Sequence, residues 1–148
     1  MKSLIVYDSH YGSTQAVAQA IAESLLGEVQ LQHVDQVNLD DLASLDLLII
    51  GSPTFGAKPS DKIQAFLPKI GAPGSPDARA AAFDTRLTWR FLKSYGFAAH
   101  RIEDALKAKG WTLAVPPEGF YVKGIRSGKL KDGELARAVA WSKGVFNP

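Results

Sequence analysis

The chain has 148 residues, of which 46% are hydrophobic and 22% are charged, so we expect a packed core and no extensive disorder. It contains no cysteine, which excludes disulfides, thiolate metal ligands, cysteine nucleophiles and dithiol redox chemistry. The formal net charge is +2, and no stripe of basic and aromatic residues follows one element, which argues against nucleic-acid binding.

No apolar run reaches the roughly 20 residues that a membrane helix needs, so we expect no membrane insertion. Met1-Lys2-Ser3 leads directly into an apolar run, without the pattern of a secretory signal, so we expect a cytoplasmic protein. No linker, repeat or low-complexity tract interrupts the pattern. Residues 1–148 are therefore expected to form a single domain.

Apolar runs alternate with helical patterns along the chain. Residues 4–7 are apolar and predict a buried strand, and apolar side chains at helical spacing over 17–25 predict a helix that Gly27 ends. Residues 29–34 alternate between apolar and polar, which predicts a half-exposed strand. Residues 45–51 are almost wholly apolar and predict a central strand.

Further helices and strands alternate in the second half of the chain. They are a helix over 63–70 that begins near Pro59-Ser60-Asp61, a strand over 80–83, a helix through 102–106 that ends at Gly110, a strand over 111–115 that resumes at 120–122, and a last helix capped by Asp132.

Strands separated by helices indicate βαβ units and a parallel sheet covered on both faces. The alternating run 29–34 belongs at an edge, because central parallel strands are apolar throughout. We therefore predict an α/β three-layer sandwich with a five-stranded parallel sheet in the order 2-1-3-4-5. This order places a switch point between the first and third strands, where ligands bind in open α/β sheets.

The loop after the first strand, residues 9–14, contains three hydroxyl residues, one glycine and the start of a helix. Backbone N–H groups in such a turn, aided by the helix N-terminus, can hold a phosphate. The loop has no lysine or arginine, so amides and hydroxyls alone would hold the anion. The alternative is plain N-capping of the helix by Ser13 or Thr14.

Related phosphate sites are excluded by particular residues. The dinucleotide fingerprint Gly-x-Gly-x-x-Gly and the nucleotide-triphosphate loop Gly-x-x-x-x-Gly-Lys are both absent. A phospho-receiver domain shares the strand order but needs an aspartate where this chain has Gly51-Ser52. A small phosphatase needs a cysteine nucleophile.

The loop after the third strand, residues 51–60, contains two glycines and two prolines, which predict a defined shape. Phe55 lies there without a local core to fill, so a planar ring stacked on it would supply burial. The alternative is that Phe55 folds back onto the second helix. Gly56 permits the close approach of a flat ligand or a peptide flip.

Several segments resemble the flavodoxin family. Residues 5–14 resemble its phosphate loop, and residues 49–54 resemble its second FMN loop. Residues 81–86 and 124–138 resemble the third FMN loop and the last loop and helix of a subgroup of bacterial and archaeal flavodoxin-domain proteins. The likeness spans nearly the whole chain and implies a short-chain form, since no long insertion splits the fifth strand.

The resemblance implies one FMN at the switch point, with its phosphate on residues 9–14 and its ring between residues 53–57 and 84–97. Trp89, Tyr95 or Phe97 would supply the second aromatic cover of the ring. The residues implied to bind the cofactor are Ser9, His10, Tyr11, Gly12, Ser13, Thr14, Pro53, Thr54, Phe55, Gly56, Ala57, Asp84, Thr85, Arg86, Trp89, Tyr95, Gly96 and Phe97.

Arg86 follows the fourth strand, and its fixed cation could stabilise negative charge on reduced flavin. It could instead face solvent or pair with Asp84. No residue is expected to act as a nucleophile or general base, and three separated histidines predict no metal site. His10 is expected to bond to phosphate or to face solvent.

The resemblance implies a monomeric electron-transfer protein that cycles FMN through oxidised, semiquinone and hydroquinone states. Its partners would be a reductase and an acceptor protein. The chain departs from the family by being slightly basic, where typical flavodoxins are strongly acidic. Two alternatives stay open: an FMN-dependent NAD(P)H or quinone reductase, and an FMN-free flavodoxin-like module that binds a partner protein.

Overall fold

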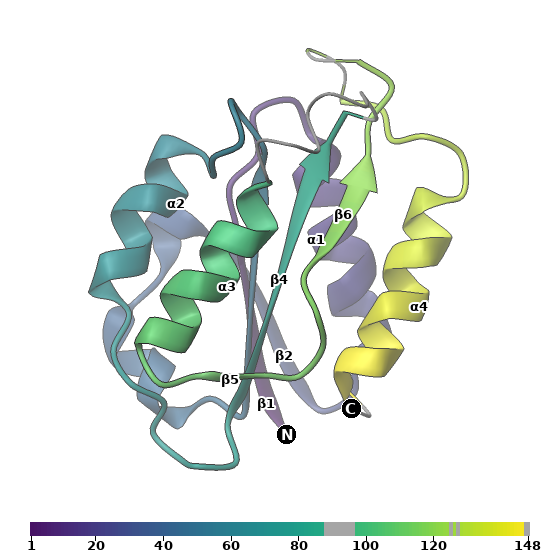
Figure 1. The fold of residues 1–148 in the computed structure, drawn as a ribbon. Coiled ribbons are helices and arrows are strands. Elements are labelled where there is room, and N and C mark those ends of the chain that lie inside the picture. Colours follow the sequence, from purple (N-terminus) through teal and green to yellow (C-terminus); the bar gives the residue numbers. More distant parts are fainter. Residues whose placement is uncertain (88–96, 125, 127, 147–148) are drawn as a thin grey trace.

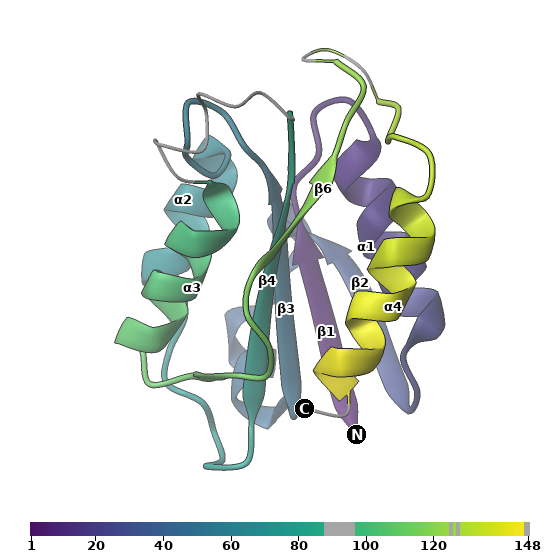
Figure 2. The same cartoon turned by 45° about the vertical axis from the view of Figure 1, so that its right-hand side comes forward.

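A computed structural model describes residues 1–148 except 88–96, 125, 127 and 147–148. One parallel sheet runs through the described residues, and its strands occur in the order β2-β1-β3-β4, with β5 and β6 both paired to β4 (Figures 1 and 2). The strands are β1 (Lys2–Tyr7), β2 (Glu28–His33), β3 (Leu47–Pro53), β4 (Arg79–Arg86), β5 (Thr112–Leu113) and β6 (Glu118–Tyr121). The predicted parallel sheet and its order are confirmed.

Helices cover both faces of the sheet, which gives the predicted three layers (Figure 2). Helices α1 (Ser13–Ser24) and α4 (Glu134–Phe146) lie on one face, and α2 (Asp61–Phe66) and α3 (Ala98–Ala108) lie on the other. Helix α2 passes into a 3₁₀ turn at Leu67–Lys69, where Pro68 supplies no backbone N–H. Each face of the sheet has its own buried apolar cluster.

Burial along the strands follows the sequence pattern. Every residue of β3 is buried, whereas β2 lies at the sheet edge and none of its residues is fully buried. The predicted fifth strand is two short strands, because Pro116 and Pro117 lie between β5 and β6 and cannot donate to the ladder. The last helix begins at Glu134, two residues after Asp132.

Gly51, near the end of β3, is required by close packing. A methyl group there would lie 2.0 Å from the ring of Phe83, and this ring packs edge-on against Phe120 and Trp141. Near the carboxyl end of β3, the absence of a side chain at Gly51 therefore leaves room for the aromatic cluster of Phe83, Phe120 and Trp141.

The end of β4 is fixed by a buried ion pair. The carboxylate of Asp84, which is fully buried, accepts hydrogen bonds from Arg86 Nε at 2.6 Å and Nη2 at 2.7 Å. It also accepts from the backbone N–H of Ala99, in the first turn of α3, at 2.9 Å. Burial raises the pKa of Asp84, while the guanidinium and the Ala99 N–H act in the opposite direction.

The guanidinium of Arg86 is held on two further sides. Its Cζ lies 3.6 Å from the ring centroid of Phe97, the residue before α3. A methyl group on Gly119 of β6 would lie 1.9 Å from Nε, so the side chain crosses the strand where only glycine leaves room. One side chain thus connects β4, β6 and the start of α3.

We predict that Arg86→Gln lowers the free energy of unfolding by about 3–5 kcal/mol, because it leaves a buried carboxylate without its cation. Adding Asp84→Asn should recover a large part of the loss. Urea unfolding of the two single variants and the double variant measures the coupling. Arg79→Gln on the same strand is the control, since Arg79 donates only to backbone carbonyls of Pro76 and Ala78. A loss at Arg86 no larger than at Arg79 would contradict the prediction.

Candidate cofactor-binding site

The carboxyl ends of β1, β3 and β4 meet at one edge of the sheet, as the predicted switch point requires. A small cleft of about 60 Å³ opens there between the segments that follow these strands and the end of β6. It is lined by Tyr11, Ser13, Pro53, Thr54, Phe55, Thr85, Arg86, Leu87 and Val122. The structure therefore brings the three predicted loops together.

The first loop directs backbone N–H groups at one oxygen atom. Ser9 Oγ accepts from the N–H of Gly12 at 3.1 Å and from the N–H of Gln15 at 3.3 Å. Gly12 makes this possible with a φ of 100°, a left-handed conformation that favours glycine. A hydroxyl oxygen thus already occupies the kind of position that an oxygen of a bound anion takes.

The expected alternative, N-capping by Ser13 or Thr14, is wrong. Both residues lie inside the first turn of α1, and Gly12 takes the N-cap position without a side-chain hydrogen bond. Thr14 is buried and its hydroxyl lies 2.8 Å from the hydroxyl of Thr85, which joins the first loop to β4. The N-cap residue Gly12 thus has no side chain to cap α1, and Ser9 Oγ accepts the N–H of Gln15 in its first turn instead.

The second loop ends in a two-residue turn. Phe55 and Lys58 exchange backbone hydrogen bonds of 2.9 and 3.0 Å across Gly56 and Ala57. Both central residues have positive φ, 54° for Gly56 and 66° for Ala57. In this left-handed conformation the backbone of Ala57 is strained, whereas a glycine would not be. Arg101 Nε, on α3, donates to the carbonyl of Ala57 at 2.9 Å and holds the turn from behind.

Phe55 lies at the cleft and does not join either buried cluster. Its side chain is 38% exposed, and its ring centroid lies 4.8 Å from that of His10 in the first loop. The alternative that Phe55 folds back onto the second helix is therefore wrong. Thr54 is tied to the other loops, since its N–H donates to Thr85 and its Oγ1 accepts from the N–H of Ala98.

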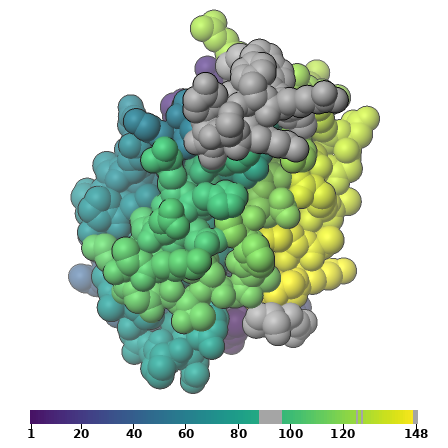
Figure 3. Space-filling model, viewed as in Figure 1, coloured from purple at the N-terminus to yellow at the C-terminus, as the bar shows by residue number. Residues whose placement is uncertain are grey.

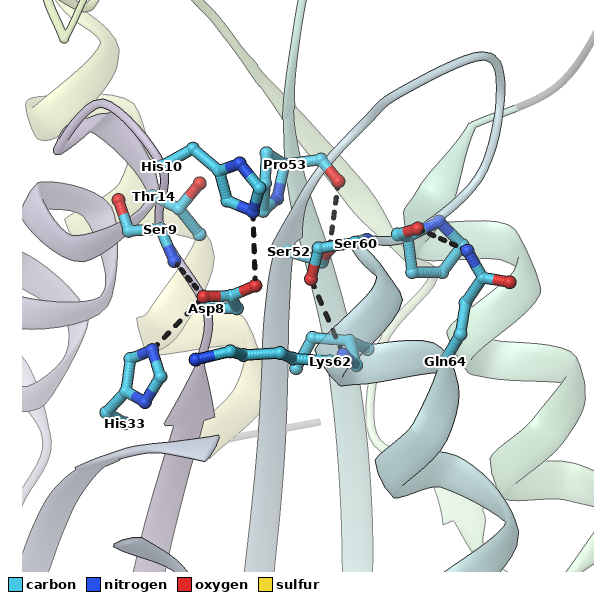
Figure 4. Close-up of polar contacts among 12 residues, drawn as sticks. Asp8, Ser9, His10, Thr14, His33, Ser52, Pro53, Ser60, Lys62 and Gln64 are labelled. Atoms are coloured by element: carbon cyan, nitrogen blue, oxygen red, sulfur yellow. Dashed lines mark hydrogen bonds and ion pairs between the residues drawn. The ribbon is translucent and has the colours of Figure 1, made fainter. Parts of the chain in front are cut away.

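The base of the second loop is closed by two serines (Figure 4). Ser52 Oγ donates to the carbonyl of Pro53 at 2.8 Å and accepts from the N–H of Ser60 at 2.9 Å. Ser60 in turn caps α2. The shape that two glycines and two prolines predicted is thus fixed by hydrogen bonds within the loop.

Asp8, which the sequence did not single out, lies beneath the first loop (Figure 4). Its Oδ1 accepts from the N–H of Ser9 at 2.9 Å and lies 3.1 Å from His33 Nε2, while Oδ2 faces His10 Nε2 at 3.4 Å. Burial tends to raise the pKa of Asp8, but the Ser60 hydroxyl, the His33 ring and the Ser9 N–H outweigh it and lower the pKa.

His33 is oriented by a second contact. Its Nδ1 accepts the N–H of Asp35 at 3.1 Å, so in the neutral ring the proton sits on Nε2 and points at Asp8. The signal for this pair was available only through strand pairing, which sets Tyr7 opposite His33. No three metal-ligating side chains within the described ranges are arranged to hold a metal ion.

The third loop is only partly described. Trp89, Tyr95 and Gly96 lie outside the described residues. Asp84 and Arg86 are bound to each other, which is one of the alternatives left open for Arg86, and Phe97 lies against the guanidinium. Thr85 lines the cleft.

The segment after β6 also reaches the first loop, which sequence reasoning did not foresee. A methyl group on Gly128 would lie 1.9 Å from the carbonyl oxygen of Tyr11, so the two backbones are in close contact. A bridge between Val122 and Leu130 closes this segment.

No helix of the described chain is long and apolar enough to cross a membrane.

The residues present fit a ligand that carries a phosphate and a flat ring. Converging amides and hydroxyls, with no lysine or arginine in the loop, suit the phosphate. Phe55, exposed at the cleft, suits the ring. These are the groups that the flavodoxin resemblance implies for FMN.

Comparison with known proteins agrees. A family model described as "Flavodoxin domain" matches residues 4–115. The flavodoxin of Aquifex aeolicus is 38% identical over 73 residues, which are 47% of this chain and 40% of that protein. The flavodoxin of Maridesulfovibrio salexigens is 34% identical over 71 residues, which are 45% of this chain and 49% of that protein. The match thus spans less than half the length of each of these relatives.

Solved structures agree on the fold. Flavodoxin 1 of Bacillus cereus has a TM-score of 0.80 at 18% identity, covering 99% of this chain and 98% of that one. A flavodoxin from the domain Archaea has a TM-score of 0.80 at 22% identity, covering 99% and 97%. Rubredoxin oxygen:oxidoreductase of Desulfovibrio gigas has a TM-score of 0.76 at 18% identity, covering 99% of this chain but only 35% of that one.

At such identities the structures speak for the fold alone, whereas the family model covers most of the chain. The resemblance read from the sequence is therefore confirmed: the chain belongs to the flavodoxin family.

Proposed function

We propose that this chain binds one FMN in the cleft at the carboxyl ends of β1, β3 and β4 and carries electrons between partner proteins. The observation that carries the proposal is the convergence of an amide-rich loop, an exposed Phe55 and the end of β4 on one cleft. Bound FMN would supply the redox chemistry, and the chain would bind, orient and tune it.

The phosphate would lie on the first loop. The N–H groups of Gly12 and Gln15, which now meet Ser9 Oγ, are available to an anion once that hydroxyl turns to donate. The N-terminus of α1 adds its partial positive charge. The ring would lie against Phe55 and beside the Gly56-Ala57 turn.

An electron carrier is favoured over a reductase by the chemistry of the cleft. Among the described residues that line it, Arg86 alone carries a charge, and its guanidinium is bound to Asp84. The cleft therefore offers a small acceptor no unpaired charged group among its described lining residues. The reductase that supplies electrons and the protein that accepts them are part of this proposal.

Gly12→Ala should weaken FMN binding about tenfold, because the loop needs the positive φ of Gly12 and a tenfold loss corresponds to about 1.4 kcal/mol. Quenching of flavin fluorescence measures the Kd. Gly133→Ala is the matched control, since Gly133 also has positive φ, also has open space around it and also precedes a helix. Equal affinity in both variants would contradict the loop's role, and a protein that ignores FMN would overturn the proposed function.

Gly56→Ala should shift the separation of the two one-electron reduction potentials by about 40 mV, equivalent to about 1 kcal/mol. The reason is that a peptide rearrangement in this turn, which would bring a carbonyl of residues 55–57 toward the reduced ring, needs glycine at position 56. Redox titration of the FMN-loaded protein measures it. Gly71→Ala, at an open position with no positive φ, should leave both potentials unchanged. An unchanged separation in Gly56→Ala would remove the rearrangement.

The FMN-loaded chain should reduce a quinone only slowly when NAD(P)H is the sole electron donor, because the described lining of the cleft offers a small substrate no unpaired charged group. The FMN-loaded chain should accept electrons from NAD(P)H readily when a flavodoxin reductase is added. Steady-state turnover measures both. Rapid turnover with NAD(P)H and a quinone alone would favour the reductase alternative instead.

A further inference from the structure

A groove of about 420 Å³ runs between α2 and α3, on the face of the sheet opposite α1 and α4 (Figures 1 and 2). Figure 3 shows the surface of this face, with α2 and α3 side by side. Leu67, Pro68, Ala105 and Ala108 give the groove apolar walls. Lys58 and Pro59 of the second loop line one part of the groove, and Pro53, Thr54 and Phe55 of the same loop line the cofactor cleft.

The charges that line the groove are all positive. Lys58, Arg101 and Lys109 line it, and no acidic side chain does among the residues that the structure describes. None of the three forms an ion pair within the described part of the chain. Lys62 and Lys107, on the same two helices but outside the groove, are paired with Asp35 and Glu103.

Two of the cations are held in place by backbone oxygens. Arg101 Nε donates to the carbonyl of Ala57 at 2.9 Å, and Lys109 Nζ donates to the carbonyl of Pro68 at 3.0 Å. A carbonyl orients a cation without neutralising it. Arg101 lies on α3, and Lys109, eight residues later, is the C-cap residue that follows this helix, which places the two about 12 Å apart along the axis. Four residues of extended chain span about the same length.

We propose that this groove docks an acidic segment of a partner protein, with aliphatic side chains against the apolar walls and carboxylates toward the three cations. A protein partner is favoured over nucleic acid because none of the described residues that line the groove is an aromatic on which a base could stack. Opposite charge also steers the encounter of two proteins. A protein with an acidic segment would then be the partner of the electron carrier, and this inference rests on the proposed function.

The position of the groove gives docking there a consequence. The turn that Arg101 holds also carries Phe55 at the cofactor cleft. A partner seated in the groove therefore lies beside the site from which electrons would leave.

The test is an NMR titration of the ¹⁵N-labelled chain with a capped peptide Glu-Ser-Leu-Ser-Glu. In an extended peptide its two carboxylates and the leucine share one face, and the carboxylates match the spacing of Arg101 and Lys109. We expect saturable shift changes confined to α2, α3 and the second loop. The peptide Lys-Ser-Leu-Ser-Lys should cause none. Binding absent, or centred elsewhere, would overturn the proposal.

The variant Lys58→Gln/Lys109→Gln should weaken the peptide about fivefold or more, since each exposed pair is worth up to about 1 kcal/mol. Lys62→Gln/Lys107→Gln lowers the net charge by the same amount and should change the affinity less than about twofold. The spectra themselves report whether each variant is folded. Equal weakening by both variants would show a general effect of net charge and would overturn the proposal that the peptide binds in the groove.

A single-stranded DNA oligonucleotide that binds the same groove as tightly as the acidic peptide would also overturn a protein partner. The titration is run with and without added FMN. If the chain binds the peptide but not FMN, the proposed docking surface is supported and the proposed electron-carrier function is contradicted. Binding of FMN without binding of the peptide would do the reverse.

Discussion

A carboxylate that water does not reach must find its partners inside the protein, and Asp84 finds them in two elements, β4 and α3. Arg86 of β4 grips both of its oxygens, and the first turn of α3 donates the Ala99 N–H. The same guanidinium requires a glycine at position 119 of β6. This pair therefore holds together the end of the sheet where the cofactor cleft opens, while the first and second loops are held by their own hydrogen bonds through Ser9 and Ser52.

This pair also changes the role of Arg86 at the cleft. A free arginine there would add a full positive charge beside a bound ring, whereas an arginine already bound to a buried carboxylate contributes mainly a fixed dipole. The negative charge nearest the phosphate loop, Asp8, is only partly satisfied, because Ser9 and His33 contact its Oδ1 whereas its buried Oδ2 has no hydrogen-bond partner among the described residues.

The parts that the sequence predicted were those governed by local periodicity. The apolar run of β3 and the alternation of β2 follow from burial on two faces or one, so the sheet order could be derived. Ser13 and Thr14 were wrongly expected as alternative caps, because Gly12 adopts a conformation that the loop's hydroxyls do not reveal. Asp8 was missed because its partner His33 lies 25 residues away and is brought near only by the pairing of β1 with β2.

The Gly56-Ala57 turn belongs to both the cleft and the groove. Ala57 is in a left-handed conformation that costs a non-glycine residue about 1–2 kcal/mol, and only its surroundings keep it there. Those surroundings are the backbone bridge between Phe55 and Lys58 and the hydrogen bond from Arg101. A carboxylate that draws Arg101 away from the Ala57 carbonyl would weaken one of these two restraints. Docking of an acidic segment in the groove would therefore be coupled to the conformation of the turn beside the cleft through the guanidinium of Arg101.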